Sequence, residues 1–339
     1  MRKILSDTCI ITNAPVPRSG LVLCGSMNVF TVKCDDDSVL YQCSIKGKVL
    51  KLNKCCYNPL CPGDAVRFLV HENNSASGQI IAMKERRSLF SRYNEKGRKP
   101  QMLAANIDRV FIIASLAHPP FRPRFIDRVL VQCEKAHLEA FIVINKMDLA
   151  HLLPPEDLYL AEERLAGYAA MGYPVLQVSA MSGTGLPALE AALDGIVCVF
   201  AGQSGAGKSS LINALLGRPA QKTGELALKY DRGAHTTVMA LMLESGMDRP
   251  DSRRFRIIDT PGLRHFIPDG IRENDLARWM RDLAPLAGNC RFGDSCTHTA
   301  EPGCALIAAF ESGAINPDRW DSFIALRNTL ARLVSNNAF

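Results

Sequence analysis

The stretch GQSGAGKSSLIN at residues 202–213 follows the apolar run IVCVFAG and begins a segment with helical spacing. It fits the pattern Gly-x4-Gly-Lys-Ser, which binds phosphate when a strand precedes it and a helix follows it. The glycines allow backbone N–H groups to close around phosphate oxygens, and the helix N-terminus adds positive potential. A glycine-rich turn without a ligand is the alternative, but the flanking elements favour a nucleotide-binding loop in an α/β domain.

Within this loop, two side chains have distinct expected roles. Lys208 is expected to reach the β- and γ-phosphates and to take part in catalysis, and the Ser209 hydroxyl oxygen is expected to coordinate Mg²⁺. The predicted nucleotide contacts in the loop are Gly202, Gln203, Ser204, Gly205, Ala206, Gly207, Lys208, Ser209 and Ser210.

Two further motifs are expected at the phosphate end of the same site. The motif DTPG begins with Asp259 at the tip of a strand-like run, where a carboxylate can hold Mg²⁺ through water, and the Gly262 N–H can sense a γ-phosphate. Before it, DRGAHTTV at 231–238 supplies Thr236 and Thr237 as candidate Mg²⁺ ligands and catalytic groups. Each motif alone is an ordinary polar turn, but their order after the phosphate loop favours a nucleotide switch.

The tetrapeptide NKMD, which begins at Asn145, ends another apolar run and predicts guanine recognition. Guanine presents its N1–H and its N2 amino group side by side, and the Asp148 carboxylate can accept both hydrogen bonds. Adenine lacks these paired donors, so a buried Asp148 would be left unpaired against it. Asn145 is expected to fix the loop and approach the other guanine edge. The Lys146 stem would cover the ring, and Ser179–Ala180 would offer a backbone N–H to guanine O6.

The motifs occur in a rotated order, because the base-reading residues at 145 and 179 precede the phosphate loop at 202 and the switches at 236 and 259. A parallel sheet can be permuted without moving its strand tips, since function depends on spatial placement and not on chain order. We therefore interpret the motifs as one site in a circularly permuted domain. The nucleotide-sensing segment around Asp259 then lies next to the C-terminal region along the chain.

The surrounding sequence has the pattern of a mostly parallel sheet. Near-continuous apolar runs alternate with segments of helical spacing, which indicates strands covered on both faces. The expected strands are 109–115, 140–146, 173–180, 196–202 and 253–260, with helices over 124–137 and 185–193. Ligands of such sheets bind at the C-terminal ends of the strands, where the motifs lie.

The first 90 or so residues contain short β-branched and aromatic runs, NVFTVKC, SVLYQCSIKG and AVRFLVHE, which indicate a small barrel. An OB-fold is the natural candidate because it commonly binds nucleic acid, and periodicity alone does not separate it from an SH3-like barrel. The run 85–100 that follows carries six Lys or Arg against two Glu, as a solvated linker or an RNA-phosphate contact would. Six cysteines here match no zinc spacing and are expected to be small buried hydrophobes: Cys24, Cys34, Cys43, Cys55, Cys56 and Cys61.

Composition and length predict a multidomain globular protein. A chain of 339 residues exceeds what one core usually serves, and the shares of 47% hydrophobic and 22% charged residues are those of a soluble protein. There is no stretch of 18 apolar residues, and the first apolar run, broken by Asp7, is too short for a secretory signal. We expect a cytoplasmic protein without a membrane partner, whose 12 cysteines are free thiols or metal ligands.

A cysteine and histidine cluster near the C-terminus has the spacing of a metal site. Cys290-x5-Cys296-x-His298-x5-Cys304 places four ligands within 15 residues, which is typical of a closed, structural Cys3His zinc site. A chance cluster of reduced residues is the alternative. Helical segments at 274–288 and 316–336 flank it, so a mostly α zinc-binding domain is predicted.

In combination and in order, these motifs resemble the circularly permuted bacterial GTPases of the ribosome small-subunit-dependent GTPase A (RsgA) family, over nearly the whole chain. The resemblance is carried by GDAVRF, ERRSLFSR, AANIDRVFIIAS, NKMDL, GQSGAGKSSLIN, HTTV, DTPGLRHF and CTHTAEPGCAL. It implies an OB-fold RNA-binding domain over 1–92, a GTPase domain over 93–272 and a zinc-binding domain over 273–339. It also implies GTP hydrolysis to GDP, stimulated by the small ribosomal subunit, whose rRNA the flanking domains would grip during late maturation until hydrolysis releases the factor. The expected protein is a monomer that uses one Zn²⁺ and, with GTP, Mg²⁺.

The sequence departs from the family pattern at two places. One extra residue separates Cys290 from Cys296, so that loop must bulge, and Gly233-Ala-His-Thr stands where the family commonly has Gly-Arg-His-Thr. In addition, the position that carries a water-orienting glutamine in many GTPases is Leu263. His235 is the candidate to orient or deprotonate water in its place, and contact of an exposed His235 with RNA is the alternative.

Two other functions are weighed against a ribosome-coupled GTPase. The first is an RNA-binding assembly factor in which GTP only sets affinity and turnover is incidental. The second, a P-loop kinase, is disfavoured because the sequence contains no lid-like arginine-rich helix and no acceptor pocket.

Overall fold

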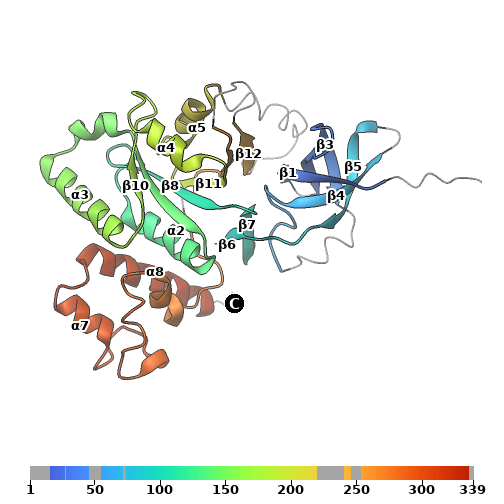
Figure 1. Ribbon diagram of the computed structural model, residues 1–339. Helices are drawn as coiled ribbons and strands as arrows, with labels where there is room; N and C mark the ends of the chain where they lie inside the picture. Colours follow the sequence, from blue (N-terminus) through green and yellow to red (C-terminus); the bar gives the residue numbers. More distant parts are fainter. Residues whose placement is uncertain are drawn as a thin grey trace, which may run out of the picture.

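The computed structural model describes residues 16–26, 28–45, 55–71, 74–219, 240–245, 253–263 and 265–335. Along the chain, a β-barrel is followed by an α/β domain and then by a small, mainly helical domain (Figure 1). Among the described residues, no helix is both long enough and apolar enough to cross a membrane.

The N-terminal barrel has five strands and is closed in the order β1-β2-β3-β5-β4. Its strands are β1 (Arg18–Ser26), β2 (Val29–Cys34), β3 (Leu40–Ile45), β4 (Ala65–His71) and β5 (Asn74–Met83). All neighbouring strands are antiparallel except β3 and β5, which pair in parallel, so the barrel closes in the OB-like order. Between the two alternatives of the sequence analysis, the OB-fold is therefore confirmed.

The barrel cysteines do not all lie inside. Cys34 and Cys43, on alternating positions of β2 and β3, are buried in the barrel core, and Cys61 is buried beside it. Cys24 and Cys56 are half-buried, and Cys55 is exposed, so the prediction of a buried hydrophobe is wrong for Cys55. The reason is its place in a turn outside the strands, where no pleat directs the side chain inward.

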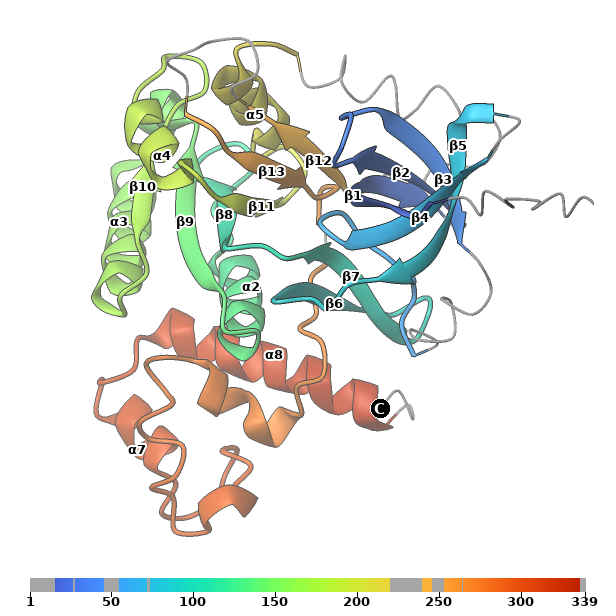
Figure 2. The same cartoon turned by 45° about the vertical axis from the view of Figure 1, so that its right-hand side comes forward.

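The basic run at 85–100 is largely a β-hairpin and not a solvated linker. Its strands β6 (Leu89–Asn94) and β7 (Lys99–Ala105) pair antiparallel and lie between the barrel and the α/β domain (Figure 2). Phe90 and Leu103 of the two strands are buried in the core of the α/β domain, which supplies the free energy that orders the hairpin. The alternative, contact with RNA phosphates, stays a prediction.

The central sheet has six strands in the order β10-β9-β8-β11-β13-β12. The strands are β8 (Arg109–Ser115), β9 (Glu139–Asn145), β10 (Val175–Gln177), β11 (Val197–Gly202), β12 (Leu241–Glu244) and β13 (Arg256–Asp259). All pairs are parallel except β12 with β13, so the mostly parallel α/β fold is confirmed. The antiparallel edge strand β12 was absent from the sequence prediction.

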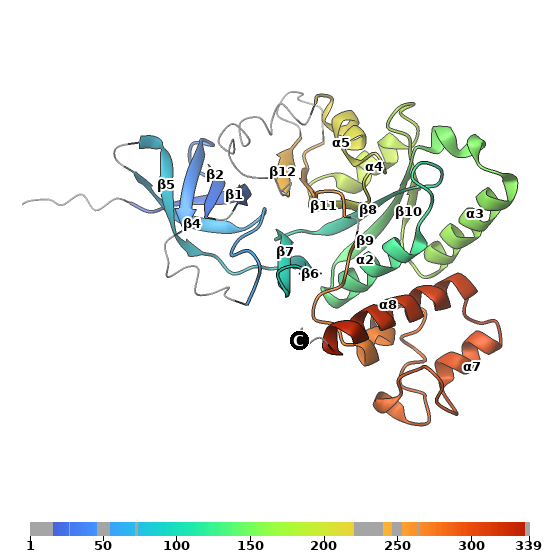
Figure 3. The same ribbon diagram turned by 180° about the vertical axis from the view of Figure 1, so that it is seen from behind.

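Helices cover both faces of this sheet (Figure 3). On one face lie α2 (Pro123–Lys135) and α3 (Pro155–Ala170), and on the other α4 (Leu186–Leu193) and α5 (Lys208–Leu216). Successive residues of β8 alternate between the two cores, since Val110 packs with α2 and Phe111 with α5. This double burial explains why the strands are continuous apolar runs in the sequence.

The C-terminal domain contains α7 (Ala305–Glu311) and α8 (Pro317–Ser335), with the 3₁₀ turns η3 (Glu273–Trp279) and η4 (Gly293–Ser295). The predicted helix over 274–288 is thus only partly correct, because regular structure there ends with a short 3₁₀ helix followed by turns. Pro285, which lacks a backbone N–H, lies in those turns and disfavours a continuous helix.

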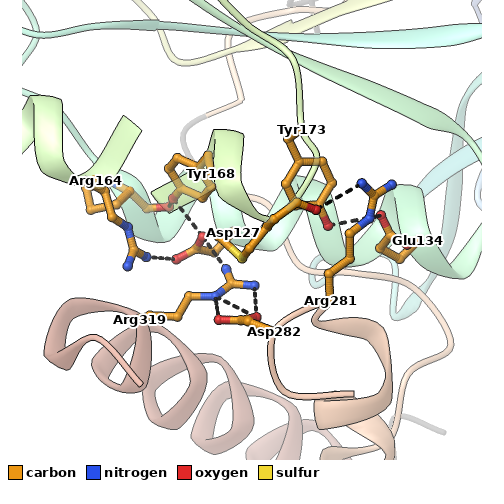
Figure 4. Close-up of polar contacts among 10 residues, drawn as sticks. Asp127, Glu134, Arg164, Tyr168, Tyr173, Arg281, Asp282 and Arg319 are labelled. Carbon is orange, nitrogen blue, oxygen red and sulfur yellow. Dashed lines mark hydrogen bonds and ion pairs between the residues drawn. The ribbon is translucent and has the colours of Figure 1, made fainter. Parts of the chain in front are cut away.

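Buried charges join the C-terminal domain to α2 (Figure 4). The Asp127 carboxylate of α2 accepts hydrogen bonds from Arg164 at 2.8 Å, from the Tyr168 hydroxyl at 2.7 Å and from Arg319 of α8 at 2.5 Å. Arg319 also pairs with Asp282. Because removing one partner of such a network leaves a buried charge unpaired, we expect the two domains to move together.

Candidate nucleotide-binding site and metal centre

The predicted nucleotide residues meet at one edge of the sheet. Asn145 ends β9, Gly202 ends β11 and Asp259 ends β13. These strands all run in the same direction, β9 and β11 on either side of β8 and β13 beside β11. Residues that are far apart and in rotated order along the chain are thereby brought together at the C-terminal ends of the strands.

The phosphate loop has the conformation expected from its sequence. It connects β11 to α5, and its Gly205 and Gly207 both have φ of 85°, the left-handed region that glycine adopts without strain. A side chain at Gly207 would also collide with Asn145, since a built Cβ lies 2.3 Å from the Asn145 Nδ2. The Lys208 side chain is buried, and its ammonium donates to the Gly202 carbonyl at 3.3 Å.

Lys208 and Asp259 form a charged pair beneath this loop. Burial lowers the pKa of the Lys208 ammonium and raises the pKa of the Asp259 carboxyl to about 6, while each partially offsets the shift of the other. Within the described part of the chain, Asp259 Oδ1 is buried and has no hydrogen-bond partner. A buried, unsatisfied carboxylate oxygen beside the phosphate loop is a suitable ligand for Mg²⁺ or one of its waters, so the donor set fits that ion.

The DTPG segment is docked directly on the phosphate loop. The Leu263 N–H donates to the Gly202 carbonyl at 3.1 Å, and a Cβ built on Gly262 would lie 3.1 Å from the Ser204 Cα. The Leu263 side chain is 1% exposed and packs in the core with α2 and α3. The side chain at the usual position of the water-orienting glutamine is therefore apolar and also points away from the nucleotide edge.

At the base end, Asn145 connects two strands to the phosphate loop. Its Nδ2 donates to the carbonyls of Ala206 at 3.1 Å and Gly207 at 3.3 Å, and its Oδ1 accepts from the Ala180 N–H at 3.2 Å. The expectation that Asn145 fixes the loop agrees with these contacts. The Ala180 N–H donates to Asn145, and its expected contact with guanine O6 stays a prediction.

Asp148 is held by a side chain whose role the sequence analysis missed. The Ser179 hydroxyl donates to Asp148 Oδ1 at 2.5 Å and itself accepts from the backbone N–H groups of Met181 and Ser182 at 3.2 and 3.1 Å. The hydroxyl therefore orients the carboxylate predicted to read guanine. The signal was present as the Ser-Ala pair at the end of the next strand, but only its backbone was considered. Lys146 lies in a left-handed turn, and its ammonium donates to the His118 carbonyl at 2.6 Å.

Three predicted residues cannot be placed. His235, Thr236 and Thr237 lie outside the described residues, and their proposed roles stay predictions. Of the remaining loop residues, Ser204, Ser209 and Ser210 are exposed and Gln203 is half-buried, so they are accessible to a ligand.

The metal-ligating residues predicted near the C-terminus form a compact cluster. The ligand atoms of Cys290, Cys296, His298 and Cys304 all lie within 4.8 Å of one another, and all four residues are buried. The Cys290 and Cys304 sulfurs are 3.8 Å apart, and the His298 Nδ1 lies 3.5 and 3.4 Å from them. Tetrahedral coordination with metal–sulfur bonds near 2.3 Å needs sulfurs about 3.8 Å apart and a nitrogen about 3.5 Å from sulfur. The cluster thus has the geometry to hold a tetrahedral metal ion.

The loops that carry these ligands are themselves well ordered by hydrogen bonds. The extra residue between Cys290 and Cys296 is accommodated by the turn η4, and Cys290 stays in the cluster. The Glu301 carboxylate accepts from the Thr297 hydroxyl and from the N–H groups of Thr297 and Thr299, both at 2.9 Å. These bonds, the Thr297 hydroxyl above all, hold the pKa of Glu301 well below its usual range. This supporting role had no recognisable spacing in the sequence.

The fold and the site define a class of protein. They are those of a circularly permuted P-loop GTPase. The evidence is the sheet order, the phosphate loop before α5, the DTPG segment at the end of β13, and the NKMD motif that precedes the phosphate loop along the chain. The family model described as RsgA GTPase matches residues 83–267, which is more than half of the chain. The chain belongs to the RsgA GTPase family and is a GTP hydrolase of that family.

Comparisons with individual proteins agree with this assignment. A protein of Chlorobaculum parvum called small ribosomal subunit biogenesis GTPase RsgA is 39% identical over 80% of this chain and 86% of its own length. A protein of the same name from Azotobacter vinelandii is 40% identical over 81% of this chain and 75% of its own. The crystal structure of YjeQ from Thermotoga maritima superposes with a TM-score of 0.66 at 28% identity, covering 93% of this chain and 99% of that one. YloQ, described as a circularly permuted GTPase, has a TM-score of 0.62 at 23% identity over 94% and 96% of the two chains and supports the fold.

Proposed function

We propose that this chain is a GTPase that binds the small ribosomal subunit, assists its late maturation, and hydrolyses GTP to GDP and phosphate when the subunit stimulates it. The observation that carries the proposal is membership of the RsgA family, whose relatives are named for small-subunit biogenesis. Release of the factor would follow hydrolysis, so that GTP turnover acts as a checkpoint. The fold adds a physical route for this coupling.

That route is the segment after DTPG. Its residues 265–271 leave the nucleotide edge and run between the β6–β7 hairpin and α2 toward the C-terminal domain. The Tyr93 N–H donates to the Ile267 carbonyl at 2.9 Å, and the Gln132 side chain accepts from the Asp269 N–H at 2.7 Å. A movement of the DTPG segment on loss of the γ-phosphate would therefore reach the hairpin, α2 and, along the chain, the C-terminal domain.

Hydrolysis would depend on a group other than the residue after DTPG. Because Leu263 is buried and cannot hydrogen-bond, intrinsic turnover should be slow. We propose His235 as the group that orients or deprotonates water when the subunit is bound. A His235→Ala protein should keep GTP binding and lose most of the subunit-stimulated rate, and full stimulated turnover in that variant would exclude the role.

The metal requirements follow from the two donor sets. We propose that Cys290, Cys296, His298 and Cys304 hold a structural zinc ion, since three thiolates and one imidazole in tetrahedral geometry leave no position open for chemistry. We propose that Ser209 and Asp259, with Thr236 or Thr237, hold the Mg²⁺ that accompanies GTP. These oxygen donors are the ones that Mg²⁺ prefers.

We propose that the chain has three domains: an RNA-binding barrel over 1–92, a GTPase domain over 93–272 and a zinc-binding domain over 273–339. Both flanking domains would contact ribosomal RNA. The protein would act as a monomer in the cytoplasm, the compartment in which a subunit-assembly factor has its partner.

The test is GTP turnover measured with and without purified small ribosomal subunits, with large subunits and ATP as controls. Strong stimulation by small subunits alone and no ATP hydrolysis is the expected result. Absence of stimulation would contradict the proposal and leave a permuted GTPase with another partner. A Lys208→Ala protein distinguishes the checkpoint function from that of a factor in which GTP only sets affinity for the subunit. The checkpoint function predicts that release of the variant from the subunit is abolished. The alternative predicts only weaker binding to the subunit.

A further inference from the structure

A cavity of about 360 Å³ opens between the phosphate loop, the start of α2 and the segment after DTPG. We call it the α2 groove and define it by Phe121, Arg122, Arg124, Arg128, Gln203 and His265. It shares only Gln203 with the predicted nucleotide contacts. The groove is thus a second concave surface beside the nucleotide site, and its lining has a different chemistry.

The lining of the α2 groove is strongly basic. Arg122, Arg124 and His265 are exposed and Arg128 is half-buried. Among the described residues neither Arg122 nor Arg128 has an ion-pair partner, and Arg124 has only a loose contact of 3.4 Å with Asp321, in which both side chains are more than half exposed. Such an exposed pair contributes little and is easily exchanged for a ligand.

The surroundings strengthen the positive potential. The first turn of α2 carries no acidic residue, so no carboxylate in that turn offsets the positive potential of the helix end. Burial first, and then the like charge of Arg124, lower the pKa of Arg128, while Glu95 acts in the opposite direction. Arg92 of the basic hairpin reaches the same place and donates to the His265 carbonyl at 3.1 Å. Within the described part of the chain, Glu95 acts on Arg92 and Arg128, and Asp321 contacts Arg124.

We propose that the α2 groove binds the phosphate backbone of RNA, and that it is the surface through which RNA acts on the nucleotide switch. Guanidinium groups match the oxygens of a phosphodiester in fork geometry, and the half-buried Phe121 at the rim offers a face on which a base can stack. The positive surface continues onto the β6–β7 hairpin through Arg92, which suits an extended polyanion better than a single small anion. The proposal rests on the proposed function, because a ribosomal subunit presents RNA.

The floor of the groove explains how occupancy would be sensed. His265 and Phe266 lie three and four residues after Gly262, and their carbonyls accept hydrogen bonds from Arg92 at 3.1 Å and from Arg128 at 3.3 Å. Arg128 also donates to Thr329 of α8 at 3.2 Å. An RNA phosphate that binds Arg128 or His265 therefore changes the hydrogen bonds that hold the nucleotide-sensing segment itself. By thermodynamic linkage, the nucleotide state must change RNA affinity by the same factor.

The test compares two doubly substituted proteins with the same change in net charge. Arg122→Gln/Arg124→Gln removes the two exposed arginines of the groove. Arg253→Gln/Arg254→Gln removes two exposed arginines before β13, at the opposite edge of the sheet. None of the four lies in the nucleotide site or the core, so both proteins should fold and bind GTP like the parent.

Binding to small subunits is measured with a non-hydrolysable GTP analogue over a range of salt concentrations. We expect the groove variant to bind about tenfold more weakly, with a salt slope lower by roughly 1 to 2 because up to two phosphate contacts are lost. The control variant should match the parent. Equal losses in both variants would indicate a net-charge effect and overturn the proposal, as would unchanged binding of the groove variant.

A fluorescein-labelled, mixed-sequence single-stranded RNA separates failure of the groove from failure of the proposed function. If small subunits do not bind the parent, the proposed function fails. RNA binding by the α2 groove is then tested with this labelled RNA alone. Binding by the parent and loss in the groove variant retains the proposal, and equal binding overturns it. Failure of the parent to bind either probe overturns both proposals. Polyglutamate and inorganic phosphate serve as competitors, and preferential binding of either one over RNA would show a carboxylate or small-anion site instead.

Discussion

At the predicted guanine end of the candidate nucleotide site the polar side chains are already held by hydrogen bonds, whereas at the predicted phosphate end Asp259 Oδ1 is not. Asn145 makes three hydrogen bonds and Asp148 is fixed by Ser179. At the other end, within the described residues, Asp259 Oδ1 is buried without a hydrogen-bond partner. Burial raises the pKa of Asp259 and lowers the pKa of Lys208, so it favours the neutral form of each group. The base end is therefore preorganised, and the phosphate end gains its missing interactions only from the ligand.

This difference has a consequence for energetics. Groups that are already oriented lose little entropy on binding and contribute specificity. Groups that are buried and under-satisfied destabilise the empty protein and gain the most when phosphate and Mg²⁺ arrive. Buried, under-satisfied groups suit a nucleotide switch, because the stability of the segment that carries them then depends on the bound nucleotide.

Substitution of Lys208 tests the phosphate end most severely. In Lys208→Ala, we expect GTP affinity to fall by about 100-fold, since a charge-assisted bond to phosphate is worth up to about 3 kcal/mol. The stability of the empty protein should change little, because relief of the buried ammonium's desolvation is offset by loss of its attraction to Asp259. Isothermal titration and urea denaturation measure the two effects, and Lys84→Ala, an exposed barrel lysine, is the control. A large loss of stability without nucleotide would contradict the comparison.

Substitution of Asp148 tests the preorganised end. Asp148→Asn replaces one acceptor by an amide donor opposite the paired donors of guanine, so GTP affinity should fall by about 10- to 100-fold. Xanthosine triphosphate, which presents an acceptor where guanine has its amino group, should bind the variant better than GTP does. Competition between the two nucleotides measures the change, and a variant that still prefers GTP would remove Asp148 from base recognition.

Acidification should act on the phosphate end through Asp259. The pKa of Asp259 is raised to about 6, above the ordinary value of 3.8 expected in the unfolded chain. The carboxyl is therefore ionised and destabilising above pH 6, and the empty protein should gain stability from this group as pH falls from 7 toward 4. The Mg²⁺-dependent part of GTP affinity should fall over the same window, by up to about tenfold per pH unit below 6. Asp259→Asn should abolish both dependences, and a pH profile identical to that of the parent would contradict this account.

The smallest effect is expected for Ser179. Ser179→Ala removes one hydrogen bond to Asp148 and leaves the Met181 and Ser182 N–H groups without their acceptor. We expect a loss of about 0.5–1.5 kcal/mol in GTP binding, or roughly 2- to 10-fold, with specificity for guanine partly retained. Ser182→Ala, which touches only Thr184 through its hydroxyl, is the matched control. A loss as large as that of Asp148→Asn would show that the serine contacts the base itself.

Much of the fold could be predicted because its signals are local. The parallel strands are long apolar runs, the phosphate loop has a fixed spacing between a strand and a helix, and the metal ligands lie within 15 residues. The errors occurred where the sequence carries no such signal. The hairpin β6–β7 resembles a charged linker because its buried residues, Phe90 and Leu103 among them, alternate with or follow charged and polar ones. The edge strand β12 has four residues, too few for periodicity to be visible.

The candidate site was predictable residue by residue, but its contacts were not. Spacing and residue type were sufficient to select Asn145, Asp148, Lys208 and Asp259, because each chemistry requires that side chain at the end of a strand. The engagement of the Ala180 N–H by Asn145 depends on the distance between two strand ends. The buried network around Asp127 joins residues 37 and 192 positions apart, so no window of sequence contains it.

The sequence alone determined which chemical groups this protein has and along which elements they lie: a phosphate-loop motif, the aspartates predicted to read guanine and to sense the nucleotide, and four candidate metal ligands. The tertiary structure decided which of these groups are satisfied and which await a ligand. It also gathered arginines of β6 and α2 and a histidine after β13 into one basic groove. The reason is that propensity and spacing act over a few residues, whereas burial, pKa and charge density depend on neighbours that only folding brings together.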